Sequence, residues 1–310
     1  MDEIRSNTLG GSAAGGEPFG EAVREVSFTA ERDGVTVERL LRGRGISRHL
    51  LTTLKAAPDG LTVDGAHVRT VDKLCAGAVL TVRVRECEPS ENIVPTALPL
   101  DIVYEDADLM IVNKPAGMAV HPSQGNRTDT VANALAFLYR SRGVPFVFRA
   151  IGRLDKNTSG LLALAKNPLS GCLLTERGEM HRAYLAVCVG ELPETGTIDA
   201  PIGRVPGSAL LREVRADGKR AVTHYERLCC QNGCSLARVW LETGRTHQIR
   251  VHFASIGHPL PGDFLYAPDY PGTGRHALHA YELTLRQPVT GEVLRFQTSL
   301  PDDLAALIAD

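Results

Sequence analysis

The sequence lacks the features that would place it in several common protein classes. No stretch approaches the roughly 18 consecutive apolar residues that a membrane-spanning helix needs, and no apolar stretch follows the few N-terminal charges, as it would in a secretory signal. Positive charge is not in excess either, because 34 Lys and Arg face 36 Asp and Glu, for a net charge of −2. We therefore expect a soluble, cytoplasmic protein with no membrane partner. Any binding to nucleic acid must depend on local basic patches.

The cysteines do not form a metal-binding pattern. There are seven of them, an odd number, and no two have the two-residue spacing typical of a zinc site. Free thiols in a reducing cytoplasm are the better interpretation. Glycine patterns for phosphate or dinucleotide binding are also missing. The sequence thus predicts no metal and no small-molecule cofactor.

Length and composition favour two domains. The chain has 310 residues, 43% hydrophobic and 23% charged, and domains of roughly 100–200 residues are usual. Residues 1–22 are rich in Gly, Ser and Ala and are expected to be a disordered tail. Residues 23–87 have the pattern of a compact α+β unit, and the prolines of residues 88–99 indicate a linker. Residues 100–310 then form the second domain.

Short strand patterns predominate in residues 100–310, with helices predicted at Thr130–Tyr139 and Pro301–Ile308. There is no regular strand–helix alternation of the kind that builds a doubly wound sheet. The expected fold class is α+β, with a mainly antiparallel mixed sheet in the second domain and a small α+β domain before it.

Basic side chains gather on two predicted helices of the N-terminal unit. Between Thr36 and Lys55 there are five Arg or Lys residues and one acid. Solvated amphipathic faces are one interpretation. However, the pattern from Gly34 to Gly77 resembles the alpha-L RNA-binding module, over about 50 residues. That resemblance implies that Arg39 and Arg48 contact RNA phosphates and supply salt-dependent affinity that is largely independent of sequence.

The most unusual stretch is residues 152–160, which runs Gly-Arg-Leu-Asp-Lys-Asn-Thr-Ser-Gly. It places one carboxylate, Asp155, between Arg153 and Lys156 in a run of turn-forming residues. Nearby cations keep a carboxylate ionised, and an ionised, positioned carboxylate can act as a nucleophile. The alternative is that Asp155 only caps the following turn, which is the commoner role of an Asp in a loop.

A second stretch, residues 243–259, contains two Arg, three His and no acid. On a helix starting near Thr246, His247 and Arg250 share a face. The His spacing is poor for zinc. Because Arg pairs bidentately with phosphates and carboxylates, the stretch suits an anion-binding surface. A basic solvated helix with histidines in the core is the alternative.

Together these two stretches resemble the signature motifs of RluA-type pseudouridine synthases. Three further segments agree with that family and occur in its order: Asn113–Met118 with Val120–Pro122, Arg182–Ala186, and His258–Pro259 followed by Gly262–Asp263. The resemblance extends roughly from Leu100 to Leu300, and several ordered motifs are a stronger signal than any one of them.

The resemblance implies an enzyme that isomerises uridine in RNA to pseudouridine, with no cofactor. Asp155 matches the family's catalytic aspartate, Tyr184 its active-site tyrosine, and Arg250 the arginine that pairs with the aspartate. The predicted contacts to substrate RNA in this domain are Arg153, Arg245 and His247.

Two positions depart from the family pattern. Gly152 stands where the family usually has His, and Arg182 stands where Lys is commoner. The missing His is not the catalytic group, so activity should survive. The departure bears on how the substrate is handled, and therefore on which RNA is modified.

The predicted partner is RNA. Large-subunit ribosomal RNA is the substrate that the resemblance implies first, with transfer RNA as the alternative, and a monomer is expected. Two competing functions are a non-catalytic RNA-binding or ribosome-assembly protein on the same fold, and a nucleoside hydrolase or other glycosidase. The sequence argues against a glycosidase because it offers no second carboxylate of the quality of Asp155.

Overall fold

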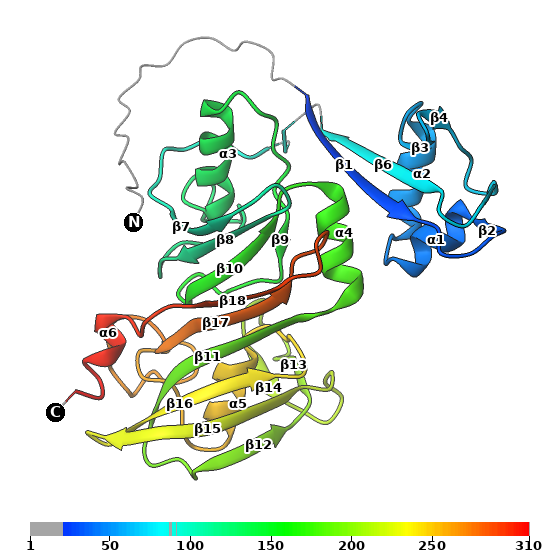
Figure 1. The fold of residues 1–310 in the computed structure, drawn as a ribbon. Coiled ribbons are helices and arrows are strands. Elements are labelled where there is room, and N and C mark those ends of the chain that lie inside the picture. Colours follow the sequence, from blue (N-terminus) through cyan, green and yellow to red (C-terminus); the bar gives the residue numbers. More distant parts are fainter. Residues whose placement is uncertain (1–20, 87–88, 91, 310) are drawn as a thin grey trace, which may run out of the picture.

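The computed structural model describes residues 21–86, 89–90 and 92–309 (Figure 1). Residues 1–20 of the predicted tail lie outside the described residues, and the first strand begins at Ala22. Among the helices within those ranges, none is long and apolar enough to cross a lipid bilayer. The chain combines a small N-terminal unit with a larger one built on a single broad sheet, which confirms the predicted α+β fold class.

The N-terminal unit is a four-stranded sheet, in the order β1-β6-β3-β4, with two helices and a separate two-stranded pair, β2-β5. Its elements are β1 (Ala22–Thr29), β2 (Val35–Thr36), α1 (Val37–Gly43), α2 (Arg48–Ala56), β3 (Leu61–Val63), β4 (Ala66–His67), β5 (Lys73–Leu74) and β6 (Val79–Glu86).

Local signals in the sequence explain where its helices begin. The Thr36 hydroxyl accepts a hydrogen bond from the backbone N–H of Arg39, and the Ser47 hydroxyl accepts one from Leu50, each at 3.2 Å. Such caps satisfy backbone donors that the first turn of a helix leaves free. The apolar faces of α1 and α2 then pack into one core with the sheet.

The larger unit contains a ten-stranded sheet whose main path runs β12-β15-β16-β11-β17-β10-β8-β7, with β18 added to β17 and β9 added to β10. Its strands are β7 (Asp101–Glu105), β8 (Leu109–Lys114), β9 (Ala150–Ile151), β10 (Ser159–Ala165), β11 (Met180–Val189), β12 (Thr195–Asp199), β15 (Val222–Gln231), β16 (Cys234–Leu241), β17 (Leu278–Arg286) and β18 (Val293–Gln297). A separate hairpin is formed by β13 (Ile202–Arg204) and β14 (Arg212–Val214).

The sheet is antiparallel except for one pair, in which β10 and β17 run parallel. Gly160 lies in that pair with φ +110°, and a Cβ at this position would come within 2.2 Å of the backbone oxygen of Ala280. Only a glycine allows two strand backbones to approach so closely in this conformation. This contact fixes the end of the segment that carries Asp155.

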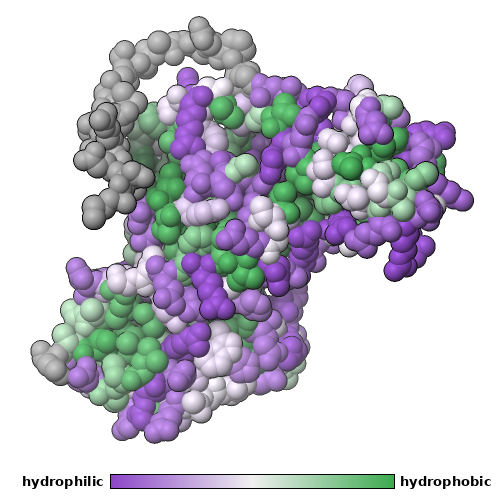
Figure 2. All heavy atoms as spheres, viewed as in Figure 1, coloured by the Kyte–Doolittle hydropathy of each residue, from purple (hydrophilic) through white to green (hydrophobic). Residues whose placement is uncertain are grey.

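Helices cover both faces of the strands at the centre of the sheet. Apolar side chains of α3 (Val131–Ser141) and α5 (Gln248–Ser255) share one core, while α4 (Pro168–Arg177) contributes to the core on the opposite face. Every residue of β10 is buried as a result. A last short helix, α6 (Asp302–Ala305), is shorter than the predicted Pro301–Ile308. Apolar side chains gather around it at one end of the sheet (Figure 2).

The two units meet along α4, which stands beside the N-terminal unit in Figure 1. Leu169 and Leu173 of α4 belong to the apolar core of the N-terminal unit. The described part of the predicted linker, residues 89–90 and 92–99, contains no helix or strand. It is nevertheless held in place, since the Asn133 side chain donates to the Val94 carbonyl at 2.7 Å.

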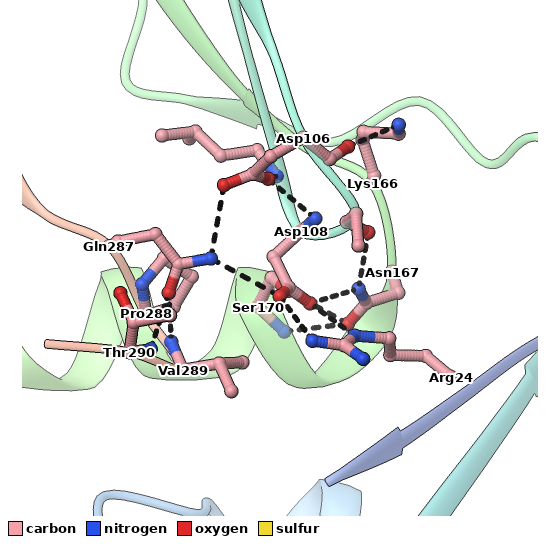
Figure 3. A network of polar contacts seen from close by, with 12 residues as sticks. Arg24, Asp106, Asp108, Lys166, Asn167, Ser170, Gln287, Pro288, Val289 and Thr290 are labelled. Carbon is pink, nitrogen blue, oxygen red and sulfur yellow. Dashed lines mark hydrogen bonds and ion pairs between the residues drawn. The ribbon is translucent and has the colours of Figure 1, made fainter. Parts of the chain in front are cut away.

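A buried polar network also joins the two units (Figure 3). The Arg24 guanidinium of β1 donates to both oxygens of Asp108, at 2.8 and 2.7 Å. Asp108 lies in the turn between β7 and β8 and also accepts hydrogen bonds from Asn167, Ser170 and Gln287. The carboxylate is thus paired and hydrogen-bonded on both oxygens, as a buried charge requires.

Candidate active site

A cleft of about 500 Å³ opens where three segments meet. They are the loop between β9 and β10, the first half of β11, and the end of β16 with the loop that leads into α5. These are the two stretches that the sequence singled out and the segment with the predicted tyrosine. The fold therefore brings together residues that lie far apart in the chain.

Asp155 lies on the loop between β9 and β10, and its side chain is 17% exposed. The loop turns tightly, because the backbone N–H of Thr158 donates to the Asp155 carbonyl at 3.1 Å. The Thr158 hydroxyl is in turn 2.8 Å from His276 Nε2. The turn expected from the sequence is present, but the Asp155 carboxylate does not cap it, since the one hydrogen bond it accepts from a described residue comes from Arg250 on α5.

Arg250 bridges two carboxylates. Its Nη1 donates to Asp155 Oδ2 at 3.0 Å, and its Nε and Nη2 donate to the two oxygens of Asp263 at 2.6 and 2.7 Å. Burial opposes the charged forms, yet the pairing is strong enough to raise the pKa of Arg250 and to lower that of Asp263. Asp263 thus orients the guanidinium that holds Asp155.

The helix that carries Arg250 begins at Gln248, two residues later than predicted, because His247 has a left-handed backbone with φ +59°. The Gln248 side chain holds the preceding loop by accepting hydrogen bonds from the Thr243 hydroxyl and the Arg245 N–H. A positive φ outside glycine is uncommon and often marks a functional position. It turns the His247 side chain into the cleft.

His247 Nε2 lies 3.8 Å from Asp155 Oδ2, and Nδ1 lies 2.8 Å from the Tyr266 hydroxyl. The Tyr266 oxygen also accepts the Arg212 N–H at 3.0 Å, so Tyr266 connects the His247 ring to β14. Burial lowers the pKa of His247, which favours the neutral ring.

Tyr184 on β11 lines the same cleft and is 8% exposed. Burial raises the pKa of its phenol, although the charge of Arg182 acts in the opposite sense, and the charge of Asp155 adds a smaller increase. The phenol is therefore protonated near neutral pH. No described residue forms a hydrogen bond with its hydroxyl, which leaves this group available to a ligand in the cleft.

Lys114 supports the Asp155 loop from behind. It is 1% exposed, and its ammonium donates to the carbonyls of Pro115, Met118 and Lys156 at 2.8, 2.7 and 3.0 Å. Burial and the charge of Arg275 lower its pKa to about 7. The family-like segment that begins at Asn113 thus positions the loop next to Asp155 without lining the cleft.

Arg182 fills the space beside Gly152. Gly152 has φ +85°, and a Cβ built on it would meet the Arg182 guanidinium at 2.7 Å. Arg182 also donates through Nη2 to the carbonyl of Ile151, while its Nε is buried with no partner among the described residues. Position 152 therefore has no room for a histidine side chain as long as Arg182 stays where it is.

The remaining predicted RNA contacts fall into two groups. Arg153 and Arg245 are exposed and line the cleft, and Arg245 is held by a hydrogen bond to the Arg220 carbonyl at 3.0 Å. Arg39 and Arg48 are exposed on α1 and α2 and do not line the cleft. The structure thus separates the N-terminal cations from the Asp155 site.

Sequence reasoning assigned no role to four residues that build this site: Lys114, Arg182, Asp263 and Tyr266. Three of them stand in segments that resemble the family, so the sequence pointed to these segments but did not give these residues a role. Tyr266 lies outside those segments, and nothing in its surroundings marked it. Over the described ranges, no group of three or more His, Cys, Asp or Glu is placed to hold a metal ion.

This geometry suits chemistry by a single carboxylate. Asp155 has one oxygen bound by Arg250, whereas its Oδ1 accepts a hydrogen bond from no described residue. A carboxylate that is held on one side and free on the other can act on a molecule bound beside it. The phenol, the neutral imidazole and the exposed arginines complete a cleft suited to a polar ring attached to an anionic backbone.

Comparison with known proteins agrees with the motifs. The family described as RNA pseudouridylate synthase matches residues 108–255, which include Asp155, Tyr184 and Arg250. An uncharacterized RNA pseudouridine synthase of Bacillus subtilis, YjbO, is 38% identical over 278 residues, covering 88% of this chain and 98% of that protein. The ribosomal large subunit pseudouridine synthase D of Nitrosomonas europaea is 41% identical over 263 residues, covering 80% and 76% of the two chains.

Solved structures have a similar fold. Human RNA pseudouridylate synthase domain containing 1 matches with a TM-score of 0.56 and 27% identity, over 68% of this chain and 89% of the human one. The similarity in sequence to the bacterial proteins and the similarity in fold to the human one therefore point to the same kind of protein.

Proposed function

We propose that this chain, which belongs to the RNA pseudouridine synthase family, isomerises specific uridines in large-subunit ribosomal RNA. The isomerase activity and the RNA substrate follow from the family. The choice of RNA is supported by relatives named ribosomal large subunit pseudouridine synthase D, from several bacteria. A reducing cytoplasm suits this substrate and the six described cysteines, all of which are free thiols.

The observation that carries the assignment of the site is the contact between Asp155 and Arg250 at the wall of the cleft. In the reaction, the bond between N1 of uracil and C1′ of the ribose breaks, the base turns, and a bond between C5 and C1′ forms. The hydrogen at C5 leaves, and N1 gains a proton. Atoms balance without any redox step or second substrate.

Asp155 acts on the ribose of the everted uridine. Attack at C1′ and removal of the 2′ hydrogen both need an ionised carboxylate close to the sugar, and both pass through a sugar with oxocarbenium-like charge. Arg250 holds the carboxylate in position, and Asp263 fixes Arg250 in turn. The preformed geometry lowers the entropic part of the barrier.

Tyr184 packs against the detached base and keeps it in the cleft while it turns. Eversion costs a few kcal/mol of stacking. Arg153 and Arg245 at the rim offset that cost by binding the flanking phosphates, since arginine pairs well with phosphate oxygens.

The test is tritium release from RNA labelled at carbon 5 of uridine. Wild type should release tritium from large-subunit ribosomal RNA of a strain lacking the gene, and Asp155→Asn should release none while still binding that RNA. Full release by Asp155→Asn would remove Asp155 from its role. Release from transfer RNA alone would change the substrate, free uracil would indicate a hydrolase, and no release by wild type from any RNA would indicate a binding protein.

The N-terminal unit is proposed to bind RNA backbone through Arg39 and Arg48. Both side chains are exposed, and neither forms an ion pair with a described residue, whereas Arg69 of the same unit is paired with Asp72. Each phosphate contact contributes about one unit to the slope of log affinity against log salt. The Arg39→Ala, Arg48→Ala double variant should flatten that slope by about two, and Arg69→Ala should leave it unchanged. An unchanged slope in the double variant would remove the two arginines from the interface.

A further inference from the structure

The only tryptophan of the chain, Trp240, stands in the wall of the cleft and is 38% exposed. It lies on β16 directly opposite Ala183 of β11, which is the neighbour of Tyr184 in the chain. Adjacent strands are roughly 5 Å apart. Trp240 is therefore one strand away from the segment that carries the proposed active-site tyrosine.

The Trp240 ring is held in a fixed orientation. The His224 ring on β15 packs against it, with centroids 5.5 Å apart and planes at 21°. His224 is itself held at both nitrogens, by Thr197 Oγ1 at 2.9 Å and by Glu242 Oε1 at 3.0 Å. A rigid aromatic surface loses little conformational entropy when a ligand binds to it.

A cation lies next to this surface. The Arg238 guanidinium is 5.7 Å from the centre of the Trp240 ring, and its Nε donates to the Tyr281 hydroxyl at 2.8 Å. Arg238 also lines the cleft. Tryptophan and arginine side by side offer both stacking and cation–π contacts to a planar ring.

Nothing within the described chain uses the exposed part of Trp240. Its indole N–H donates to no described residue, and the side chain belongs to none of the apolar cores. The exposed part of the side chain and the free indole N–H are therefore available to a ligand in the cleft.

We propose that Trp240, supported by His224 and Arg238, binds an unpaired nucleobase that neighbours the target uridine in the RNA. This rests on the proposed function, because it requires an everted uridine at Asp155. Eversion removes a stacking partner from the adjacent base, and single-stranded bases are recognised by stacking on aromatic rings and arginine planes. The cleft therefore selects RNA in which the target uridine lies beside an unpaired nucleotide.

The tryptophan itself reports this contact, because its emission is the only tryptophan signal of the protein. The full chain carrying Asp155→Asn is titrated with a short single-stranded RNA that has a central uridine, and with the blunt duplex of the same sequence. Filter binding measures the affinity independently. The single strand should change the emission at saturation and the duplex should not. An unchanged emission with saturating single strand would overturn the proposal.

Kinetics on an RNA that the wild type modifies give a second test. Trp240→Ala should raise KM about tenfold, as expected for the loss of one stacked base, and Trp240→Phe should recover most of the affinity. The matched control is Phe137→Ala, which removes an aromatic that is 44% exposed on α3 and does not line the cleft. Its KM should equal that of wild type.

Abasic nucleotides separate stacking from a structural role. With an abasic nucleotide on one side of the target uridine, the KM ratio between Trp240→Ala and wild type should fall to about one, because the partner base is already missing. A ratio that stays near tenfold with an abasic nucleotide on either side would overturn the proposal. Loss of tritium release in Asp155→Asn is a separate readout, so failure of the stacking proposal and failure of the proposed function can be told apart.

Discussion

Two arginine–carboxylate networks in this protein look alike and differ in one respect. Asp108, between the two units, accepts hydrogen bonds on both oxygens from Arg24 and from three further side chains, and its side chain is 1% exposed. Asp155, in the cleft, accepts one hydrogen bond from Arg250 and is 17% exposed. The first carboxylate is saturated, whereas the second has an oxygen that no described residue binds.

This difference supports a structural role for Asp108 and the reactive role proposed for Asp155. A buried carboxylate is tolerated when all its lone pairs accept hydrogen bonds, and it then has no free oxygen for a reaction. A carboxylate held firmly on one side and open on the other is available for chemistry. Both charges lie in a protein whose total charge is close to zero, so the distinction depends on local geometry alone.

The largest effect should come from weakening the contact that holds Asp155, the proposed catalytic acid. Arg250→Lys keeps the charge but cannot reach Asp155 and Asp263 together, because only the arginine fork makes these contacts at once. We expect kcat to fall roughly a hundredfold or more, the usual effect of displacing a catalytic group by about 1 Å. Arg24→Lys at the saturated network should change kcat less than about twofold. Tritium release by both variants, with circular dichroism to confirm folding, makes the comparison. Equal losses of kcat in the two would contradict it.

The next effect is on stability, where substitution of Asp108 should cost more than substitution of Asp155. Asp108→Asn breaks the buried pair with Arg24, and we expect the free energy of unfolding to fall by about 3 kcal/mol, with kcat of the folded enzyme retained. Asp155→Asn leaves Arg250 paired with Asp263, so the free energy of unfolding should change by less than about 1 kcal/mol. Urea unfolding of both variants measures this. A larger loss of stability in Asp155→Asn than in Asp108→Asn would break the comparison.

The saturated network should also depend on pH. Burial would raise the pKa of Asp108, but hydrogen bonds from Arg24, Asn167 and Ser170 lower it below its ordinary value. The pKa of an Asp in an unfolded chain is about 3.9, so the unfolded chain takes up this proton first as the pH falls. The stabilisation is therefore complete above about pH 4 and is lost as the pH falls through the lowered value.

Asp108→Asn lacks this titrating group. The difference in unfolding free energy between wild type and the variant should be largest near neutral pH and should shrink as the pH falls to about 3. Urea unfolding at a series of pH values tests this. A difference that is constant over the series would show that the carboxylate does not owe its effect to ionisation.

The sequence predicted what is encoded locally. The α+β fold class and the predominance of short strands in residues 100–310 follow from patterns among neighbours in the chain. Asp155 stood out because its loop combines turn formers with cations. Its pairing with Arg250, 95 residues away, came only from the resemblance to a family.

What the sequence could not predict depends on the order and register of strands. Arg24 meets Asp108 across 84 residues because β1 lies beside α4 and the β7–β8 turn. Arg182 reaches Gly152 because β11 and the β9–β10 loop border the same cleft. Neither contact leaves a periodic or compositional trace, since each depends on one side chain at one position of the folded sheet.

The smallest of these effects concerns that last pair. Gly152→Ala should cost about 1–2 kcal/mol for a side chain at positive φ, and its Cβ should also displace the Arg182 guanidinium from 2.7 Å. We expect kcat/KM to fall roughly tenfold, the equivalent of about 1.4 kcal/mol. Gly43→Ala is the control, because Gly43 has no positive φ and a Cβ there meets nothing within 4 Å.

Arg182→Lys distinguishes backbone strain from the clash, because the narrower ammonium leaves room beside position 152. If the clash dominates, Gly152→Ala should be less harmful in the Arg182→Lys background than in wild type, so that the two changes are not additive. If strain alone dominates, the loss should be the same in both backgrounds. The first result would establish that the glycine at position 152 is required because an arginine occupies position 182. The departure from the family pattern at position 152 would then be a consequence of the arginine at position 182.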